Sequence, residues 1–278
     1  MIQLFHTVSE DCSKIVTKRY SSSFSSAIRL LHKDLRTPIY NIYGFVRFAD
    51  EIVDTFHDHK KEILMQEFKK ETFDAIERGL SLNPILNSFQ RTVNQYDIDH
   101  ELIYAFFHSM ELDLSKTTYD KKEYQEYIYG SAETVGLMCL AIFCEGDKQL
   151  FEKLKVSAGA LGAAFQKVNF LRDIKADYAG LSRMYFPNCD FMNFTCQHKR
   201  EIEEDIANDF RQAYHGILQL PVKARFGVYV AYRYYSSLFK KIKRMHPERI
   251  LKERISIPDL YKAMIVLSAG VKNQLKMI

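Results

Sequence analysis

The amino-acid sequence predicts an all-α protein that folds as one domain over residues 1–278, and three observations support this. Only 11 glycines and 6 prolines interrupt 278 residues, so the chain has few breaks. Apolar residues recur at spacings of three and four, the period of a helix, and not at two. Hydrophobic residues make up 47% of the chain and charged residues 27%, which is enough apolar material for a large core. We find no fixed repeat, linker or shift in composition that would divide the chain.

The apolar spacing also places individual helices. The first clear series begins near Ile42 and runs to Phe56, with Pro38 as an early-turn residue. Similar patterns predict helices over residues 98–113, 120–144, 147–176, 199–218, 222–245 and 258–276. The segment VSAGALGAAF, residues 156–165, is rich in alanine and glycine. We interpret it as a place where helix backbones approach closely, because it is not GxGxxG and no strand precedes it.

Charge and composition exclude several classes of protein. The formal charge of +4 is too small to indicate a nucleic-acid partner, and no nucleic-acid-binding motif accompanies it. The longest stretch without Asp, Glu, Lys or Arg has 12 residues, Gly79 to Gln90, whereas a bilayer span needs about 20 apolar residues. The N-terminus lacks the pattern of a secretory signal, and the five cysteines are irregularly spaced. We therefore expect a cytoplasmic protein with reduced thiols.

One predicted helix carries four polar groups in a line. Tyr43, Arg47, Asp50 and Asp54 lie at i, i+4, i+7 and i+11. Two carboxylates at i, i+4 repel each other weakly in isolation, and a cation between them would reverse the sign of that interaction. The motif alone also fits a solvated helix face on which Arg47 pairs with Asp50.

A second acid pair makes a metal site the better interpretation. Gln166, Asn169, Asp173 and Asp177 share an arc of roughly 80° on a helix that is otherwise apolar. Buried carboxylates are costly without a cation. Mg²⁺ prefers oxygen ligands and is commonly held by one or two carboxylates together with substrate phosphates. Two facing acid pairs therefore predict Mg²⁺ bound to a diphosphate.

Four segments together resemble a known family. They are YSSSF (residues 20–24), YGFVRFADEIVD (43–54), YIYGSAETVG (127–136) and FQKVNFLRDIKADYAGLSRMYFP (165–187). Their order and content resemble the squalene/phytoene synthase family, most closely bacterial phytoene synthases, from about Ser13 to the region of Ile257. The resemblance implies an all-α isoprenoid synthase fold, a helical bundle with a central cavity between the two acidic helices.

The resemblance also implies a reaction. Family members join two prenyl diphosphates head to head through a cyclopropylcarbinyl diphosphate, and here we expect two geranylgeranyl diphosphates to give phytoene and two diphosphates in carotenoid biosynthesis. Two or three Mg²⁺ ions are implied with the substrate diphosphate. No NADPH is expected, because phytoene formation ends with the loss of a proton.

Roles for individual residues follow from the same motif match. The implied Mg²⁺ ligands are Asp50, Asp54, Asn169, Asp173 and Asp177. The four aspartates and Tyr129 are the expected catalytic residues. The expected substrate-binding residues are Ser21, Ser23, Tyr43, Arg47, Tyr127, Gln166, Arg172, Arg183 and Tyr234. Among these, Ser21, Ser23, Arg47 and Arg172 would hold diphosphate oxygens.

Several alternatives stay open from sequence. The reaction could be squalene or dehydrosqualene synthesis from farnesyl diphosphate, or the chain could be a non-catalytic assembly or lipid-binding member of the fold. Arg183 could contact diphosphate or pin its loop. Arg172 could form a salt bridge to an acid on a neighbouring helix instead of binding diphosphate. Glu51 could be an outer metal ligand or face solvent.

The sequence also predicts contacts beyond the substrate. Residues 240–254 carry seven Lys or Arg against two Glu, which predicts peripheral contact with anionic membranes. We also consider association with other carotenoid-pathway enzymes.

Overall fold

The all-α prediction is confirmed. The computed structural model describes residues 1–181, 183–187, 189, 194–252 and 254–275, and every regular element of that part is helical, with a single isolated β-bridge between Thr118 and Met184. The helices are α1 (Ile2–Tyr20), α2 (Ser22–Ile28), α3 (Lys33–Asp54), α4 (Lys61–Arg78), α5 (Pro84–Tyr96), α6 (His100–Ser115), α7 (Lys121–Ile128), the π-turn η1 (Tyr129–Glu133), α8 (Thr134–Cys144), α9 (Lys148–Leu181), α10 (Cys196–Ile217), α11 (Val222–Lys243), α12 (Pro247–Ile250) and α13 (Asp259–Gln274).

The predicted helices correspond to α3, α6, the continuous run α7–η1–α8, α9, α10, α11 and α13. The start of α3 differs, because it begins at Lys33 and contains Pro38 in its second turn. The apolar patterns had not picked out α2, α4, α5 or α12. They had also missed α1, whose buried face consists of His6, Ser9, Ser13 and Thr17 and is therefore not apolar. A search for apolar periodicity cannot detect such a face.

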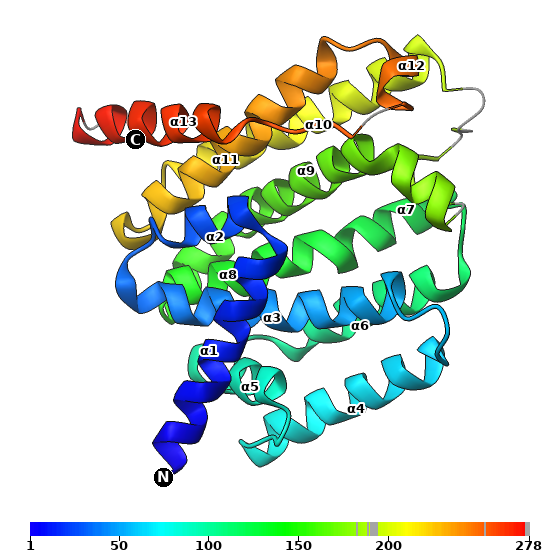
Figure 1. The fold of residues 1–278 in the computed structure, drawn as a ribbon. Coiled ribbons are helices and arrows are strands. Elements are labelled where there is room, and N and C mark those ends of the chain that lie inside the picture. Colours follow the sequence, from blue (N-terminus) through cyan, green and yellow to red (C-terminus); the bar gives the residue numbers. More distant parts are fainter. Residues whose placement is uncertain (182, 188, 190–193, 253, 276–278) are drawn as a thin grey trace.

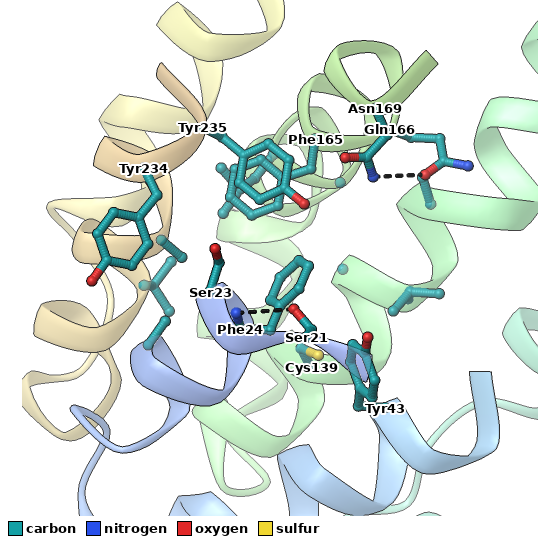
Figure 2. Close-up of a pocket in the computed structure, with 18 of the residues that line it drawn as sticks. Ser21, Ser23, Phe24, Tyr43, Cys139, Phe165, Gln166, Asn169, Tyr234 and Tyr235 are labelled. Atoms are coloured by element: carbon teal, nitrogen blue, oxygen red, sulfur yellow. Dashed lines mark hydrogen bonds between the residues drawn. The ribbon is translucent and has the colours of Figure 1, made fainter. Parts of the chain in front are cut away.

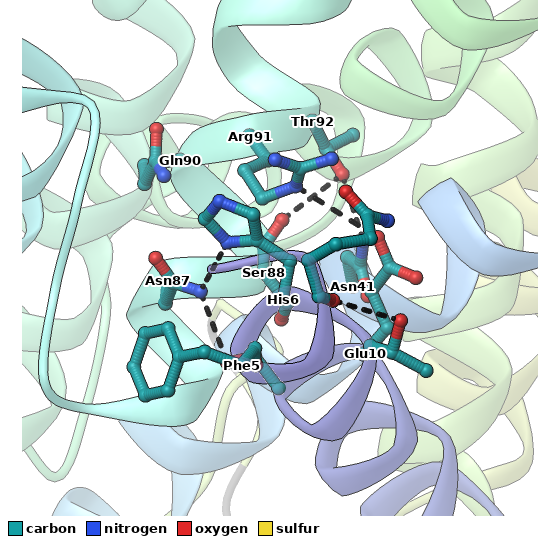
Figure 3. A network of polar contacts seen from close by, with 12 residues as sticks. Phe5, His6, Glu10, Asn41, Asn87, Ser88, Gln90, Arg91 and Thr92 are labelled. Carbon is teal, nitrogen blue, oxygen red and sulfur yellow. Dashed lines mark hydrogen bonds and ion pairs between the residues drawn. The ribbon is translucent and has the colours of Figure 1, made fainter. Parts of the chain in front are cut away.

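Helix α1 attaches through a seam of neutral polar side chains against α5 (Figure 3). The amide nitrogen of Asn87 lies 3.0 Å from Ser9 Oγ and 3.1 Å from His6 Nδ1. The hydroxyls of Ser13 and Ser88 are 2.7 Å apart. Because most of these groups find partners within the seam, burying them is tolerable, and they fix the position of α1.

The buried apolar residues form two clusters. One centres on α3, α5 and α6, where the rings of Phe45 and Phe89 stack with centroids 3.8 Å apart. The other joins α7, α9, α10 and α11. Figure 1 shows α3 and α9 crossing the middle of the molecule, with α4 and α5 at one end and α10, α11 and α13 at the other. Residues of α3 and α9 can therefore face a common space.

The glycine and alanine segment of α9 makes the close helix contact that was predicted. A Cβ added at Gly162 would lie 2.3 Å from the carbonyl oxygen of Ala132, and one at Gly136 would lie 2.7 Å from that of Ala158. No side chain fits at either distance, so α9 lies directly against η1 and α8.

The π-turn η1 interrupts the predicted helix over residues 120–144 and adds one residue to the turn. Such insertions often occur at functional sites because they change which side chains face inward. The stretch from Lys121 to Cys144 is also long and apolar enough to cross a membrane, but half of its most apolar window is buried inside the protein. That burial is typical of a core helix.

Candidate active site

Two connected cavities lie between α3 and α9. The larger has a volume of about 940 Å³ and mainly apolar walls, and the smaller, about 240 Å³, is lined mostly by polar groups. They share eight lining residues: Val46, Arg47, Asp50, Ser131, Gln166, Asn169, Arg172 and Asp173. The polar hollow therefore opens directly into a large apolar space, a shape suited to an amphiphilic ligand.

The structure brings both predicted acid pairs into the smaller cavity. Asp50 and Asp54 come from the last turns of α3, and Asp173 and Asp177 come from α9. Burial, reinforced by Asp54, raises the pKa of Asp50 to about 7. Burial together with Asp173 raises the pKa of Asp177 to about 7. Four carboxylates of one sign thus face a single hollow and disfavour one another's charge.

Arginines stand beside these acids. Arg47 lies 3.7 Å from Asp50 and also donates to Glu51. Glu51 is therefore neither a solvent-facing residue nor oriented as a ligand, because its carboxylate holds the Arg47 guanidinium. Arg172 donates to Asp173 on its own helix, with Nε 3.0 Å from each carboxylate oxygen, and Arg254 approaches Asp173 at 2.8 Å. Both Arg47 and Arg172 line the two cavities.

Two oxygens at the junction of the cavities are of the type that a hard divalent cation binds, because Asn169 Oδ1 and Ser131 Oγ are buried and have no hydrogen-bond partner. The unpartnered Arg47 Nε can only donate a hydrogen bond, so it suits an anion such as phosphate. Buried polar atoms without partners are rare and indicate a missing ligand or water. In the part of the chain that the structure describes, no three His, Cys, Asp or Glu side chains form a ready-made metal cluster. The oxygens of Asn169 and Ser131, together with the aspartate carboxylates, are the type of ligand that Mg²⁺ prefers.

The two predicted serines sit at the start of α2 and face the larger cavity. Ser21 is the N-cap of this helix, and its hydroxyl accepts a hydrogen bond from the Phe24 amide at 3.2 Å. Ser23 lines the same wall. Tyr43 lies beside Ser21 in Figure 2, and burial, followed by the charge of Asp50, raises its pKa to about 12. The Tyr43 hydroxyl therefore stays protonated and can donate a hydrogen bond.

Aromatic rings form the wall next to this polar end. Phe165 and Tyr235 stack with centroids 4.0 Å apart, and Phe24 lies 5.7 Å from Tyr235 (Figure 2). Sequence analysis selected Tyr234, which does line the larger cavity, but it missed its neighbour. In Figure 2 the Tyr235 hydroxyl points toward Asn169 and Gln166, whereas that of Tyr234 points away from them. Adjacent tyrosines in YRYYSS gave no signal to choose between the two.

Tyr127 and Tyr129 have different positions. Tyr127 lines the smaller cavity, and its hydroxyl donates to Asp113 at 2.6 Å. Tyr129 is 43% exposed and lines neither cavity, so the structure does not bring this expected catalytic residue to the site. Two residues along a helix is a rotation of about 200°, which turns one of the two side chains away.

Asp113 is a site residue that sequence analysis missed. It is 5% exposed and accepts hydrogen bonds from Tyr119 and Tyr127, both at 2.6 Å. Burial raises its pKa, and the Arg183 guanidinium opposes that rise. The available signal was an acid on the buried face of a helix, seven residues after Phe106 and three after Met110.

Arg183 links this acid to the first acid pair. Its Nη1 lies 3.3 Å from Asp54 Oδ1 and 3.7 Å from the Asp113 carboxylate, while Nη2 donates to the Asp113 carbonyl oxygen. The next residue, Met184, donates its amide to the Thr117 carbonyl at 3.0 Å. These contacts are the ones expected of an arginine that pins its loop, and they include a contact to Asp54.

Comparison with known proteins places the chain in a class of enzymes. A solved dehydrosqualene synthase with a bound ligand superposes with a TM-score of 0.85 over 98% of each chain at 19% identity, which shows the all-α isoprenoid synthase fold. The squalene/phytoene synthase family model matches residues 17–260, so this chain belongs to the squalene/phytoene synthase family, a prenyltransferase type.

Curated relatives extend this finding. A 4,4'-diapophytoene synthase of Staphylococcus haemolyticus is 28% identical over 204 residues, covering 71% of this chain and 68% of the relative. A phytoene synthase of Arthrospira platensis is 25% identical over 282 residues and covers 92% and 91% of the two chains. The family membership predicted from four motifs is thereby confirmed.

Proposed function

We propose that this protein is a Mg²⁺-dependent prenyltransferase that joins two geranylgeranyl diphosphates head to head, through a cyclopropylcarbinyl diphosphate, to form phytoene in carotenoid biosynthesis. The observation that carries the proposal is the joined pair of cavities, in which a polar hollow with four carboxylates opens into an apolar space of about 940 Å³. A prenyl diphosphate has the same division, with a charged head and a long apolar chain.

The position of each residue in the two cavities decides its proposed role. Asp50, Asp54, Asn169, Asp173 and Asp177 would hold the Mg²⁺ ions at the polar end. When bound, Mg²⁺ would neutralise the charge that develops on the leaving diphosphate. Arg47 and Arg172 offer forked donors to phosphate oxygens, and Ser21 and Ser23 offer hydroxyls from the opposite wall. On substrate binding, each arginine would exchange its carboxylate partner for phosphate.

The remaining residues protect and orient the reacting chains. The rings of Phe24, Phe165 and Tyr235 present faces that attract the positive charge left on carbon when diphosphate departs. Asp113 holds both Tyr127 and Arg183, and Arg183 in turn contacts Asp54. The apolar walls exclude water, which would otherwise capture the cation.

A farnesyl substrate is the second candidate, and it has specific support. One relative is named a 4,4'-diapophytoene synthase and one similar structure a dehydrosqualene synthase. We favour the geranylgeranyl substrate because FADEIVD and RDIKADYAGLSRMYFP most resemble phytoene synthases. A non-catalytic member of the fold is the third candidate, but a scaffold gains nothing from four partly buried like charges.

One experiment separates the three. Purified protein with Mg²⁺ is incubated with geranylgeranyl or farnesyl diphosphate, each with and without NADPH, and the hydrocarbon is identified. We expect phytoene without NADPH, at a higher kcat/KM for geranylgeranyl diphosphate. A preference for farnesyl diphosphate, or a requirement for NADPH, would favour the squalene-type alternative, and no product from either substrate would favour the non-catalytic one.

A further inference from the structure

The C-terminal helix α13 exposes its apolar side chains. Leu260, Met264, Leu267, Val271 and Leu275 are between 55% and 77% exposed. Their spacings of four, three, four and four place them within an arc of roughly 80°. The opposite face, with Ile265 and Ala269, is buried against α11. We call the five exposed residues the α13 stripe.

This arrangement is the reverse of an ordinary surface helix, which turns its polar face outward. Contiguous exposed apolar surface commonly marks a site of interaction. The stripe spans four helical turns, and no described residue of the chain covers it. It therefore requires an external partner with an apolar interior.

The start of α13 lies at the rim of the larger cavity. Arg254, Ile255, Ser256 and Ile257, which lead into α13, line that cavity, as does Lys262 in the first turns of the helix. Figure 1 shows α13 alongside α11 at the end of the molecule opposite α4 and α5. The stripe faces away from the cavity, so a partner that covers it would lie on the outer side of the helix that begins at the cavity rim.

The segment that precedes α13 in the chain is basic. Residues 240–254 hold seven Lys or Arg against two Glu, and Lys240, Lys241, Lys243 and Arg244 are all exposed. Lys241 Nζ donates to the Ser256 carbonyl at 2.8 Å, which ties the basic end of α11 to the lead-in of α13. The partner must therefore combine an apolar interior with negative charge at its surface.

We propose that α13 docks this protein on an anionic lipid bilayer, with the stripe buried at the headgroup boundary and the basic segment 240–254 on the lipid headgroups. A second copy of the chain fits less well, because a symmetric contact through this face would bring two basic segments together. Docking does not depend on the reaction. Only its use, to admit prenyl chains from the bilayer, rests on the proposed function.

Vesicle flotation without substrate tests the docking. The vesicles contain phosphatidylcholine alone or phosphatidylcholine with phosphatidylglycerol. We expect the wild-type protein to float with the phosphatidylglycerol vesicles at low salt and far less with the neutral ones. Wild-type protein that stays at the bottom of the gradient, or that floats equally with both vesicles, would overturn the proposal.

A matched pair of variants locates the surface. The triple variant Met264→Ser, Leu267→Ser, Val271→Ser removes the middle of the stripe. The control Leu4→Ser, Val8→Ser, Ile15→Ser removes side chains of α1 that are 69%, 50% and 57% exposed. We expect at least about a tenfold loss of vesicle partition in the first and less than twofold in the second. Equal partition of the two variants would contradict the assignment to α13.

Two further measurements separate docking from other causes. Circular dichroism should show unchanged helix content in both triple variants, and turnover of detergent-dispersed substrate should stay within about twofold, because the stripe lies outside the cavities. Light scattering over a range of concentrations should show the same mass for the wild type and the stripe variant. A wild-type dimer that the stripe variant abolishes would identify a second copy as the partner and overturn the membrane proposal.

Discussion

The pair Asp205 and Asp209 on α10 repeats the spacing of the two acid pairs in the candidate site but has a different environment. Lys167 lies between its two carboxylates, with Nζ 2.6 Å from Asp205 and 2.7 Å from Asp209. This lysine is only 10% exposed, so the protein itself supplies the cation for that pair. Among the described residues the ion pairs of the acids on α3 and of Asp173 are to arginines, and Lys61 acts on Asp54 only through its charge. Asp50 and Asp177 have a pKa of about 7.

The comparison shows why DxxxD is weak evidence when taken alone. The same four-residue spacing occurs in a structural ion pair between α10 and Lys167 of α9 and in a candidate metal site between α3 and α9. What differs is the source of the positive charge, which is a buried lysine in one case and arginines that a phosphate could recruit in the other. The next predictions test that difference.

The largest expected effect is on catalysis. Asp50→Asn or Asp173→Asn should lower turnover at saturating Mg²⁺ by about a thousandfold or more, because each removes a charged ligand from the site where diphosphate leaves. Asp205→Asn is the matched control, since Asp209 still pairs with Lys167, and it should stay within about threefold of wild type. Steady-state rates on purified proteins provide the measurement. Similar rates in all three variants would show that the pairs do not differ.

The next largest effect is on stability, and here we expect the Asp205–Asp209 pair to be more sensitive than the candidate site. Lys167→Met leaves Asp205 and Asp209 without their cation, so we expect the free energy of unfolding to fall by about 2 kcal/mol, less than for a fully buried pair because Asp205 is half exposed. Asp50→Asn should not destabilise the Mg²⁺-free protein, because it removes a charge that its neighbours disfavour. Urea unfolding without metal measures both. A larger loss for Asp50→Asn than for Lys167→Met would contradict the comparison.

A smaller effect is the dependence of folding stability on pH. The pKa of Asp50 and of Asp177 is about 7 in the folded protein, against an ordinary value of 3.8. Between about pH 4 and pH 7 the folded state therefore keeps protons that the unfolded chain has lost, so stability without metal should fall as the pH rises and level off above this window. Stabilisation by added Mg²⁺ should grow over the same range.

Thermal unfolding at several pH values, with and without Mg²⁺, measures this dependence. The double variant Asp50→Asn, Asp177→Asn serves as the reference for all other titrating groups. The wild type should lose more stability than this reference between pH 5 and pH 7, as expected from the two raised pKa values. Parallel curves for the two proteins would refute the assignment of this dependence to Asp50 and Asp177.

The smallest contrast concerns two tyrosines. Tyr127→Phe removes a hydrogen bond to the buried Asp113 and should reduce kcat about tenfold. Tyr129→Phe changes a side chain outside both cavities and should leave kcat within about twofold. Because each substitution deletes one hydroxyl, the pair is matched in chemistry. The reverse order of effects would restore Tyr129 as a catalytic residue.

The sequence by itself predicted the all-α class, the two acid stripes and most of the long helices from spacings along one helix, because residues three or four apart always share a face. Helix α4 was missed although Met65, Phe68 and Ile76 repeat on its buried face. The family followed for a similar reason, since its motifs are short, contiguous and ordered. Helix α1 shows the limit, because its buried face is polar and is recognisable only beside the partners on α5.

Tertiary structure decided everything that depends on contact between segments far apart in the chain. Asp113 joins the site only because α6, α7 and the loop at Arg183 meet there, and Asp205 differs from Asp173 only because Lys167 points toward α10. The packing of α7 against α6 brings Tyr127 to Asp113, whereas Tyr129 stays exposed. Helical periodicity specifies a face, but the neighbour that this face meets, and the charge it brings, arises only when the chain folds.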